Sequence, residues 1–323
     1  MKKQEEIKVR MNSLGKQGKP FAFLIDFLAE KPLIFDFTEP QQNIWWQIPG
    51  SSNLPENKTR KVLKHWATFP VSIDIYKKGF EKIMQHIYGG DTYLLNFTQP
   101  TAIETNLSLE DIFHISSATY KICLKDKFVC FSPETFVKIE NGKIYSFPMK
   151  GTIDADIENA EQIILTDSKE IAEHNTIVDL IRNDLSLVAE NVVVEKFRYL
   201  SHLQTNNKNL WQVSSKISGD LSANYAENIG DIIFKMLPAG SVSGAPKKKT
   251  LEIIRQSENY DRGYYTGIFG YFDGKNLDSC VLIRFIESQN GKLVYKSGGG
   301  LTFMSNAEKE YDEMLKKVYV PTA

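Results

Sequence analysis

The sequence contains few cysteines, almost no net charge and no long apolar run. Its three cysteines, Cys123, Cys130 and Cys280, are odd in number and show no Cys-x-x-Cys spacing. This disfavours both a disulfide framework and a zinc site. The formal net charge of −1 gives no basic footprint for nucleic acid and no charge excess that would attract the protein to an acidic membrane. We therefore expect neither nucleic acid nor a membrane as a partner.

The pattern also gives no sign of a targeting segment. The first 19 residues are charged and contain no apolar stretch of the kind that a signal peptide needs. The apolar run at 21–28 is interrupted by Asp26 and is far shorter than a membrane-spanning helix. A cytoplasmic location is therefore the expectation.

Hydrophobic periodicity predicts an α+β fold, a single large domain in which antiparallel β-sheets pack with helices. Asn141-Gly142 and Asn290-Gly291 each stand between two β-prone runs and predict tight hairpin turns. Helices are expected at 79–88, 109–125, 168–189, 224–237, 246–257 and 306–319, and strands at 92–98, 128–132, 136–148, 191–200, 209–218, 264–273, 278–287 and 292–297.

The N-terminal part of the chain has a weaker pattern than the rest. Residues 1–70 contain aromatic and proline-rich pieces that suggest short strands and loops. We interpret 1–70 as a short N-terminal region integrated into the fold, and 71–323 as the region that carries the chemistry.

Two copies of Lys-Glu-x-x-Glu, at 169–173 and 309–313, are the most informative motif. Each copy lies in a predicted helix, so Glu170 and Glu173 share one helical face, as do Glu310 and Glu313, and like charges at this spacing repel. A divalent cation between two such faces would remove the repulsion, and carboxylate oxygens suit Mg²⁺. Either copy alone is more typical of a solvated helix, so the metal hypothesis depends on the other motifs.

Several segments near these copies are suited to bind an anion. The glycine- and serine-rich loop at 238–246 opens a helix and offers free N–H groups, although it does not have the spacing of a Walker A loop. Three glycines at 298–300 allow a close backbone approach. Arg284 interrupts an apolar strand and has a planar fork that suits a carboxylate, unless it simply faces outward. Lys317 follows Glu313 by one helical turn and could pair with it or with a substrate anion.

Lys150 and Glu134 could supply the reacting groups. They flank the predicted Asn-Gly hairpin, which could bring their strands together. A lysine that loses its proton can act as a nucleophile, and a nearby glutamate can act as a general acid. A surface lysine beside a turn is the usual explanation of such a position, and spacing alone does not establish the catalytic one. His202 is open to two interpretations, as a half-buried structural histidine or as a catalytic one.

Taken together, these segments resemble the chorismate-utilising enzymes. The family includes anthranilate synthase component I, aminodeoxychorismate synthase component I, isochorismate synthase and salicylate synthase, and its members bind Mg²⁺ and chorismate. The resemblance extends over roughly 75–320 and follows the family's order. It is carried by Ser-Pro-Glu at 132–134, Pro-Met-Lys-Gly-Thr at 148–152, Glu-His at 173–174, Asp-Leu-Ile-Arg-Asn-Asp at 179–184, His-Leu at 202–203, the run at 238–247, Arg-Gly-Tyr-Tyr-Thr-Gly at 262–267, the glycines at 298–300 and Glu-Tyr-Asp-Glu at 310–313.

The resemblance implies a role for each candidate residue. Glu173 and Glu313 would bind Mg²⁺ directly, with Glu170 and Glu310 in support. Glu134 would protonate the departing C4 hydroxyl of chorismate. The substrate-binding residues that it implies are Tyr265, Arg284, the backbone of Gly298 and Gly300, and Lys317, with His202 and Ser243 also in the pocket.

Lys150 distinguishes between branches of the family. The Pro-x-Lys-Gly-Thr form looks like that of the aminodeoxychorismate synthases, whereas anthranilate synthases typically have alanine at this position. The resemblance implies that Lys150 attacks C2 of chorismate and that ammonia then adds at C4, which gives 4-amino-4-deoxychorismate for 4-aminobenzoate and folate synthesis. Leu94 stands where the water-using members have a lysine, which argues against water as the nucleophile. No glutaminase signature is present, so ammonia would come from a separate glutamine amidotransferase subunit.

The sequence also departs from the family, and two other interpretations stay open. Many relatives have a glutamine in the segment that reads Tyr-Leu-Leu-Asn here at 93–96, Thr135 replaces the usual arginine, and the Leu-Leu-Glu-Ser tryptophan-site motif is not found. The nearest alternative is anthranilate synthase component I. An alternative of another class is a chorismate-binding protein without turnover. The unsuitable spacing of the 238–246 loop argues against a nucleotide-binding module.

Overall fold

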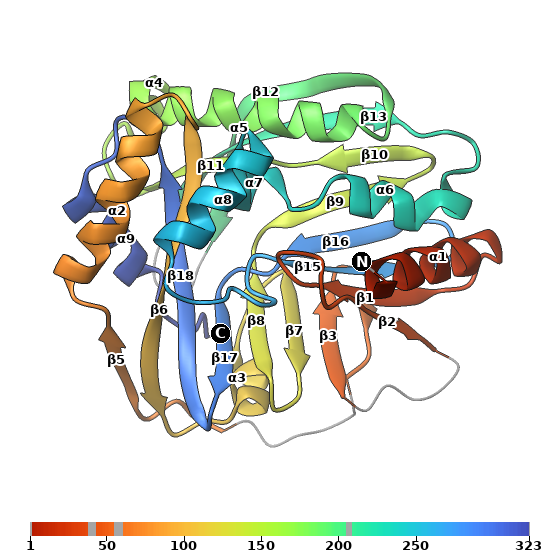
Figure 1. Cartoon of the computed structure of the whole chain (residues 1–323), viewed down its shortest axis with the longest axis horizontal. Helices are drawn as coiled ribbons and strands as arrows, with labels where there is room; N and C mark the ends of the chain where they lie inside the picture. Colours follow the sequence, from red (N-terminus) through yellow and green to blue (C-terminus); the bar gives the residue numbers. More distant parts are fainter. Residues whose placement is uncertain (1, 38–42, 55–60, 205–208, 323) are drawn as a thin grey trace.

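The computed structural model describes residues 2–37, 43–54, 61–204 and 209–322, and its chain forms two large antiparallel β-sheets packed with helices (Figure 1). The predicted α+β class is therefore confirmed. The first sheet has the strand order β11 (Met149–Asp154), β13 (Asn209–Asp220), β10 (Lys143–Ser146), β9 (Thr135–Glu140), β16 (Leu277–Val281), β15 (Ile268–Phe272), β1 (Phe21–Ile25) and β2 (Leu33–Asp36), and β12 (Glu190–Gln204) also pairs with β13.

The second sheet contains the other strands that line the site. Its order is β14 (Gly244–Ala245), β6 (Leu94–Thr105), β18 (Lys292–Leu301), β17 (Phe285–Gln289), β8 (Phe128–Ser132), β7 (Tyr120–Leu124), β3 (Ile44–Ile48) and β4 (Ser51–Ser52), and β5 (Trp66–Pro70) also pairs with β6. Apolar side chains from both sheets, among them Leu24, Trp46 and Phe269, share one buried cluster. Burial of this apolar surface holds the two sheets against each other.

Helices cover both sheets. The helices and the short 3₁₀ turn are α1 (Lys2–Lys16), α2 (Ile73–Tyr88), α3 (Leu109–Ile115), α4 (Ala160–Thr166), α5 (Ser168–Ser186), η1 (Tyr225–Asn228), α6 (Ile229–Lys235), α7 (Gly240–Ser243), α8 (Lys247–Ser257) and α9 (Ala307–Lys316). Helix α5 packs on β12 and β13, while α2, α8 and α9 lie beside β6 and β18 (Figure 1). The helices that carry the two Lys-Glu-x-x-Glu copies thus pack against different sheets.

Both predicted Asn-Gly hairpins are present. Asn141 and Gly142 join β9 to β10 with φ angles of 52° and 78°, and Asn290 and Gly291 join β17 to β18 with φ angles of 50° and 77°. Positive φ at both central residues is what a two-residue hairpin turn requires, and asparagine and glycine tolerate it.

Two predicted elements are wrong in part. The helix expected at 109–125 ends at Ile115, and Tyr120–Leu124 forms β7. The strand expected at 278–287 is two strands, because the chain leaves the first sheet after Val281 and enters the second at Phe285. Arg284 therefore lies at the crossing and not inside a strand, with φ of 56°, a left-handed conformation that arginine seldom adopts.

The N-terminal region contains a helix as well as strands. The prediction of strands and loops for 1–70 missed α1, whose buried Ile7, Met11 and Leu14 form a narrow stripe among charged residues. Strand β1 pairs with β15 from Phe21↔Phe272 to Ile25↔Ile268, so this region shares a sheet with the C-terminal half. In the described residues, no helix is both long and apolar enough to cross a membrane.

Candidate active site

A cavity of about 570 Å³ is lined by strands of both sheets and by the two Lys-Glu-x-x-Glu helices. Among the described residues, every predicted site residue except His202 and Ser243 lines this cavity. Because these residues range from position 134 to position 317, the fold brings distant parts of the chain together. The predicted residues that line it are Glu134, Lys150, Glu170, Glu173, Tyr265, Arg284, Gly298, Gly300, Glu310, Glu313 and Lys317.

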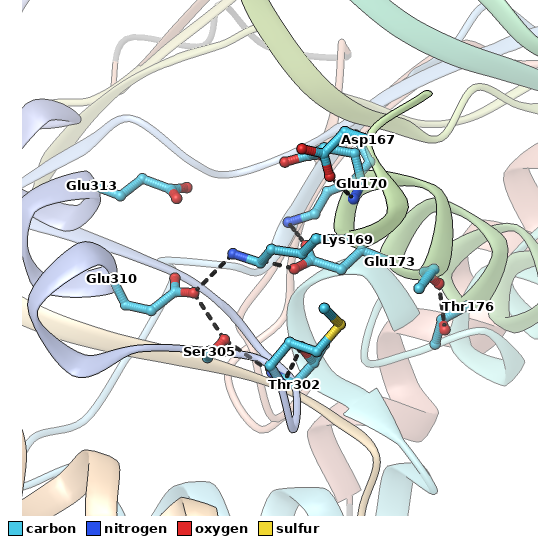
Figure 2. Close-up of polar contacts among 12 residues, drawn as sticks. Asp167, Lys169, Glu170, Glu173, Thr176, Thr302, Ser305, Glu310 and Glu313 are labelled. Carbon is cyan, nitrogen blue, oxygen red and sulfur yellow. Dashed lines mark hydrogen bonds and ion pairs between the residues drawn. The ribbon is translucent and has the colours of Figure 1, made fainter. Parts of the chain in front are cut away.

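The two glutamate pairs face each other across this cavity (Figure 2). Asp167 caps the N-terminus of α5, where its side chain accepts a hydrogen bond from Glu170 N, and the Asn306 side chain caps α9 by accepting one from Lys309 N. These caps fix the first helical turns, which contain Glu170 and Glu310, and Glu173 and Glu313 follow one turn later. Glu173 and Glu310 are almost fully buried, with exposed fractions of 4% and 5%. All four glutamates line the cavity, so both members of each pair lie on the same side of their helix.

A lysine bridges the two pairs. Lys169 Nζ lies 3.6 Å from Glu173 Oε1 and 3.4 Å from Glu310 Oε1, and thus connects α5 to α9 (Figure 2). Ser305 Oγ donates a second hydrogen bond to Glu310 Oε1 at 2.8 Å. Lys169 was given no role from the sequence, although it is the first residue of the motif.

The four carboxylates suit a hard divalent cation. Glu170 Oε2 and Glu173 Oε1 are buried without a hydrogen-bond partner in the described structure, and such oxygen atoms have free lone pairs. Burial raises the pKa of Glu170, while nearby Lys150 opposes the shift. Among the described residues, no three carboxylate, histidine or cysteine side chains already surround one point. The chemistry of these oxygen donors nevertheless fits Mg²⁺. Lysine ammonium groups lie among the carboxylates.

Lys150 is paired with a carboxylate of the first glutamate pair. Its Nζ lies 2.6 Å from Glu173 Oε2. Burial lowers the pKa of Lys150, but the neighbouring carboxylates, Glu173 foremost, outweigh this effect and leave the pKa above its usual value. In this arrangement Lys150 is a charged ammonium group and must lose a proton before it can attack carbon.

Glu134 has the environment of a general acid. Burial raises its pKa, and a hydrogen bond from Ser241 and the charge of Arg284 offset part of the shift. Ser241 Oγ donates to Glu134 Oε1 at 2.7 Å. A raised pKa favours the protonated carboxyl group, which can donate its proton to a leaving group. The sequence pointed to the segment at 238–246, which contains Ser241, but Ser243 was named as the site residue. The buried hydroxyl group of Ser243 instead donates a hydrogen bond to Ala239 O.

Cationic groups and open backbone lie beside the second glutamate pair. Lys317 Nζ lies 2.8 Å from Glu313 Oε1 and 2.8 Å from Gly298 O, and burial lowers its pKa. A Cβ at Gly298 would stand 2.1 Å from Phe97 O on the paired strand, so only glycine fits there. Arg284 and the buried Tyr265 also line the cavity. Two cations beside accessible backbone form a surface suited to carboxylates.

His202 lies away from the cavity. It is exposed on β12, and its ring centroid is 4.8 Å from that of Trp211 on β13. The structure therefore does not bring this predicted residue to the other candidates. In the pairing of β12 with β13, which sequence reasoning did not predict, His202 stands opposite Trp211.

A buried ion pair connects segments that line the cavity. Arg262 and Glu258 have side-chain exposures of 2% and 1%, and Arg262 Nη2 lies 2.6 Å from Glu258 Oε1. Arg262 also donates to the carbonyl oxygens of Asn96 at 2.6 Å and Val242 at 3.0 Å. It thereby connects β6 to α7, the short helix that contains Ser241. Its position in the Arg-Gly-Tyr-Tyr-Thr-Gly motif was the available signal.

Comparison with known proteins identifies the family. The model of a family described as chorismate binding enzyme matches residues 34–323, and the chain belongs to this family of chorismate-utilising enzymes. A solved structure titled as a putative 2,3-dihydroxybenzoate-specific isochorismate synthase from Bacillus anthracis superposes with a TM-score of 0.71 at 19% identity, covering 97% of this chain and 86% of that one. At that identity the likeness concerns the fold alone.

Relatives of known sequence carry several different names. An "uncharacterized PabA-like protein" of Haemophilus influenzae is 51% identical, with 96% of this chain and 94% of the relative covered. Anthranilate synthase component 1 of Acetivibrio thermocellus is 33% identical, with 84% and 56% covered. Aminodeoxychorismate synthase component 1 of Salmonella typhimurium is 31% identical, with 92% and 67% covered. The latter two relatives are longer than this chain.

Proposed function

We propose that this protein aminates chorismate to 4-amino-4-deoxychorismate, with ammonia delivered by a glutamine amidotransferase partner. The observation that carries the proposal is the position of Lys150, a potential nucleophile on the wall of the cavity that also holds Glu134 and both glutamate pairs. Membership in the chorismate-binding family supplies the substrate. The aminodeoxychorismate synthases among its relatives supply the reaction type.

Chorismate has two carboxylates, and the cavity has two kinds of partner for them. Arg284, Lys317 and the open backbone at 298–300 line the cavity and would hold one carboxylate through charge-assisted hydrogen bonds. The glutamates repel an anion, so the second carboxylate needs a cation beside them. Glu173 and Glu313 would hold Mg²⁺ for this purpose, with Glu170 and Glu310 in support, and the ion would neutralise charge on substrate and protein alike.

The reaction would proceed in two substitutions. Neutral Lys150 Nζ forms a bond to C2 of the ring, the ring double bonds shift, and the C4 hydroxyl leaves as water with the proton that Glu134 donates. Ammonia then forms a bond to C4, the double bonds shift back, and the C2–N bond to Lys150 breaks. An amine nucleophile divides one difficult displacement into two easier ones. Ser241 holds the Glu134 carboxyl group in place at 2.7 Å.

Anthranilate synthase activity is the second candidate, because a relative with that name is 33% identical. Both reactions would use the same carboxylates and cations. The two candidates differ at position 150, where anthranilate synthases typically have alanine and so form no covalent lysine adduct. A chorismate-binding protein without turnover would have no need of Glu134 and Lys150 in one cavity.

Product identification tests the proposal. The purified chain is incubated with chorismate, Mg²⁺ and an ammonium salt at mildly alkaline pH, and the products are separated with mass detection. We expect a product that retains the enolpyruvyl group, and we expect Lys150→Ala to abolish its formation. Anthranilate as the product, or full turnover by Lys150→Ala, would contradict the mechanism. If chorismate stays unchanged, the assay is repeated with glutamine and a glutamine amidotransferase subunit, and continued inactivity there would contradict the proposed activity.

A further inference from the structure

The two Lys-Glu-x-x-Glu copies have the same sequence pattern but their lysines lie in different places. Lys169 bridges Glu173 and Glu310 across the cavity. Lys309, its counterpart in the second copy, is exposed, and no ion pair or other partner of its side chain is present in the described residues. Only the first copy therefore places a cation between the two helices (Figure 2).

Lys169 is the most loosely held of the three lysines at the glutamates. The Nζ–oxygen distances are 2.6 Å for Lys150 with Glu173 and 2.8 Å for Lys317 with Glu313, whereas those of Lys169 are 3.4 Å and 3.6 Å. Strong charge-assisted hydrogen bonds have N–O distances of about 2.7–2.9 Å. Lys169 thus neutralises the carboxylates mainly through its charge and is the easiest of the three lysines to displace.

The acceptors of Lys169 belong to the proposed metal site, one to the ligand Glu173 and one to the supporting Glu310. Glu173 is 4% exposed, and its Oε1, which faces Lys169 at 3.6 Å, has no hydrogen-bond partner in the described structure. Glu310 Oε1 faces the same ammonium group from the other helix. One position between the helices cannot hold an ammonium group and a divalent cation together, because both carry positive charge and both need Glu173 Oε1.

We propose that Lys169 is a tethered cation that occupies the divalent-metal position between α5 and α9, and that the metal must displace it to bind. The proposal rests on the proposed function, from which the metal site comes. Lys169 keeps the opposed carboxylates neutralised and the two helices together in the metal-free protein. The side chain is 35% exposed and so has open space into which it can turn. It is a positioning residue and not a catalytic one.

Metal affinity measured without substrate tests the proposal. Full-length wild-type protein, Lys169→Met and Lys309→Met are titrated with Mn²⁺ alone, and the free ion is followed by its electron paramagnetic resonance signal. We expect Lys169→Met to bind Mn²⁺ about tenfold more tightly, as competition from one ion pair would predict. Lys309→Met removes the same charge from the matching position of the other copy, and we expect its affinity to stay within about twofold.

The control variants separate displacement from simple charge and from misfolding. Lys169→Arg keeps the charge and should bind Mn²⁺ no more tightly than the wild type. In EDTA, Lys169→Met should melt at a lower temperature than Lys309→Met, and Mn²⁺ should raise its melting temperature more than that of the wild type, since tighter binding stabilises more. Equal affinities in Lys169→Met and the wild type, or equal tightening in both methionine variants, would overturn the role of Lys169 alone. If no variant bound Mn²⁺, the metal site itself and the metal part of the proposed function would fail with it.

Discussion

The two Lys-Glu-x-x-Glu copies look alike in the sequence and differ in the structure. In the first, Glu173 is buried and pairs with Lys150 and Lys169. In the second, the Glu313 side chain is 50% exposed and pairs only with Lys317 among the described lysines and arginines. The residue that follows each copy also differs, since His174 is a buried polar group and Met314 a buried apolar one. A repeated motif therefore does not imply a repeated environment, and the two copies can contribute to one site in unequal ways.

The largest expected effect is common to both copies. Glu173→Gln and Glu313→Gln each remove a carboxylate charge that the proposed metal site needs, so each should lower kcat/KM for chorismate by about a thousandfold, or about 4 kcal/mol of transition-state stabilisation. Steady-state kinetics at saturating Mg²⁺ measures this. Glu308→Gln is the matched control for Glu313→Gln, because Glu308 also lies on α9. Its partner is Lys77, which is not part of the described cavity lining. Full activity in either site variant would rule out a joint metal site.

The next effect belongs to the first copy alone. Burial foremost, together with the charge of Arg198, lowers the pKa of His174 to about 4 from 6.5. The unfolded chain takes up this proton first, so the contribution to stability is complete above about pH 6.5 and is lost as the pH falls toward 4. The free energy of unfolding should drop across this window by about 3 kcal/mol more in the wild type than in His174→Gln.

Urea unfolding from pH 7 to pH 4 measures the difference. A Met314→Leu variant changes the matching position of the second copy and should follow the wild-type pH profile. Parallel profiles for the wild type and His174→Gln would show that His174 is not a buried neutral group.

A smaller effect should separate the glutamates themselves. In EDTA, Glu173→Gln leaves Lys150 and Lys169 without their common partner, and we expect it to lower the free energy of unfolding by about 2 kcal/mol. The half-exposed Glu313 should matter less, with a loss below about 1 kcal/mol in Glu313→Gln. Denaturant unfolding of the metal-free proteins measures both values. Equal losses would mean that the difference in burial has no energetic consequence.

Local signals in the sequence were sufficient for much of the fold and the site. The Asn-Gly turns were predictable because only a few residues tolerate positive φ at both turn positions. Glu173 and Glu313 were placed in one pocket through a family resemblance supported by several motifs. All but two of the predicted site residues line the cavity.

The failures have a common physical cause, which is long-range contact. The break at Arg284 occurs because the chain passes from one sheet to the other, and no local property of its apolar neighbours signals this. His202 packs against Trp211 on the paired strand β13 and is not part of the described cavity lining. The bridge from Lys169 to Glu310 joins residues 141 positions apart. Burial and partners of this kind depend on the assembled sheets, and periodicity does not contain them.

The most direct test of the account is a crystal structure of Lys150→Ala with Mn²⁺ and chorismate. We expect one anomalous peak between Glu173 and Glu313, a chorismate carboxylate on the ion, and Lys169 Nζ turned out of the site. A peak bound by one copy only, or chorismate bound with Lys169 still between Glu173 and Glu310, would contradict the claim that two unequal copies of one motif hold a single cation.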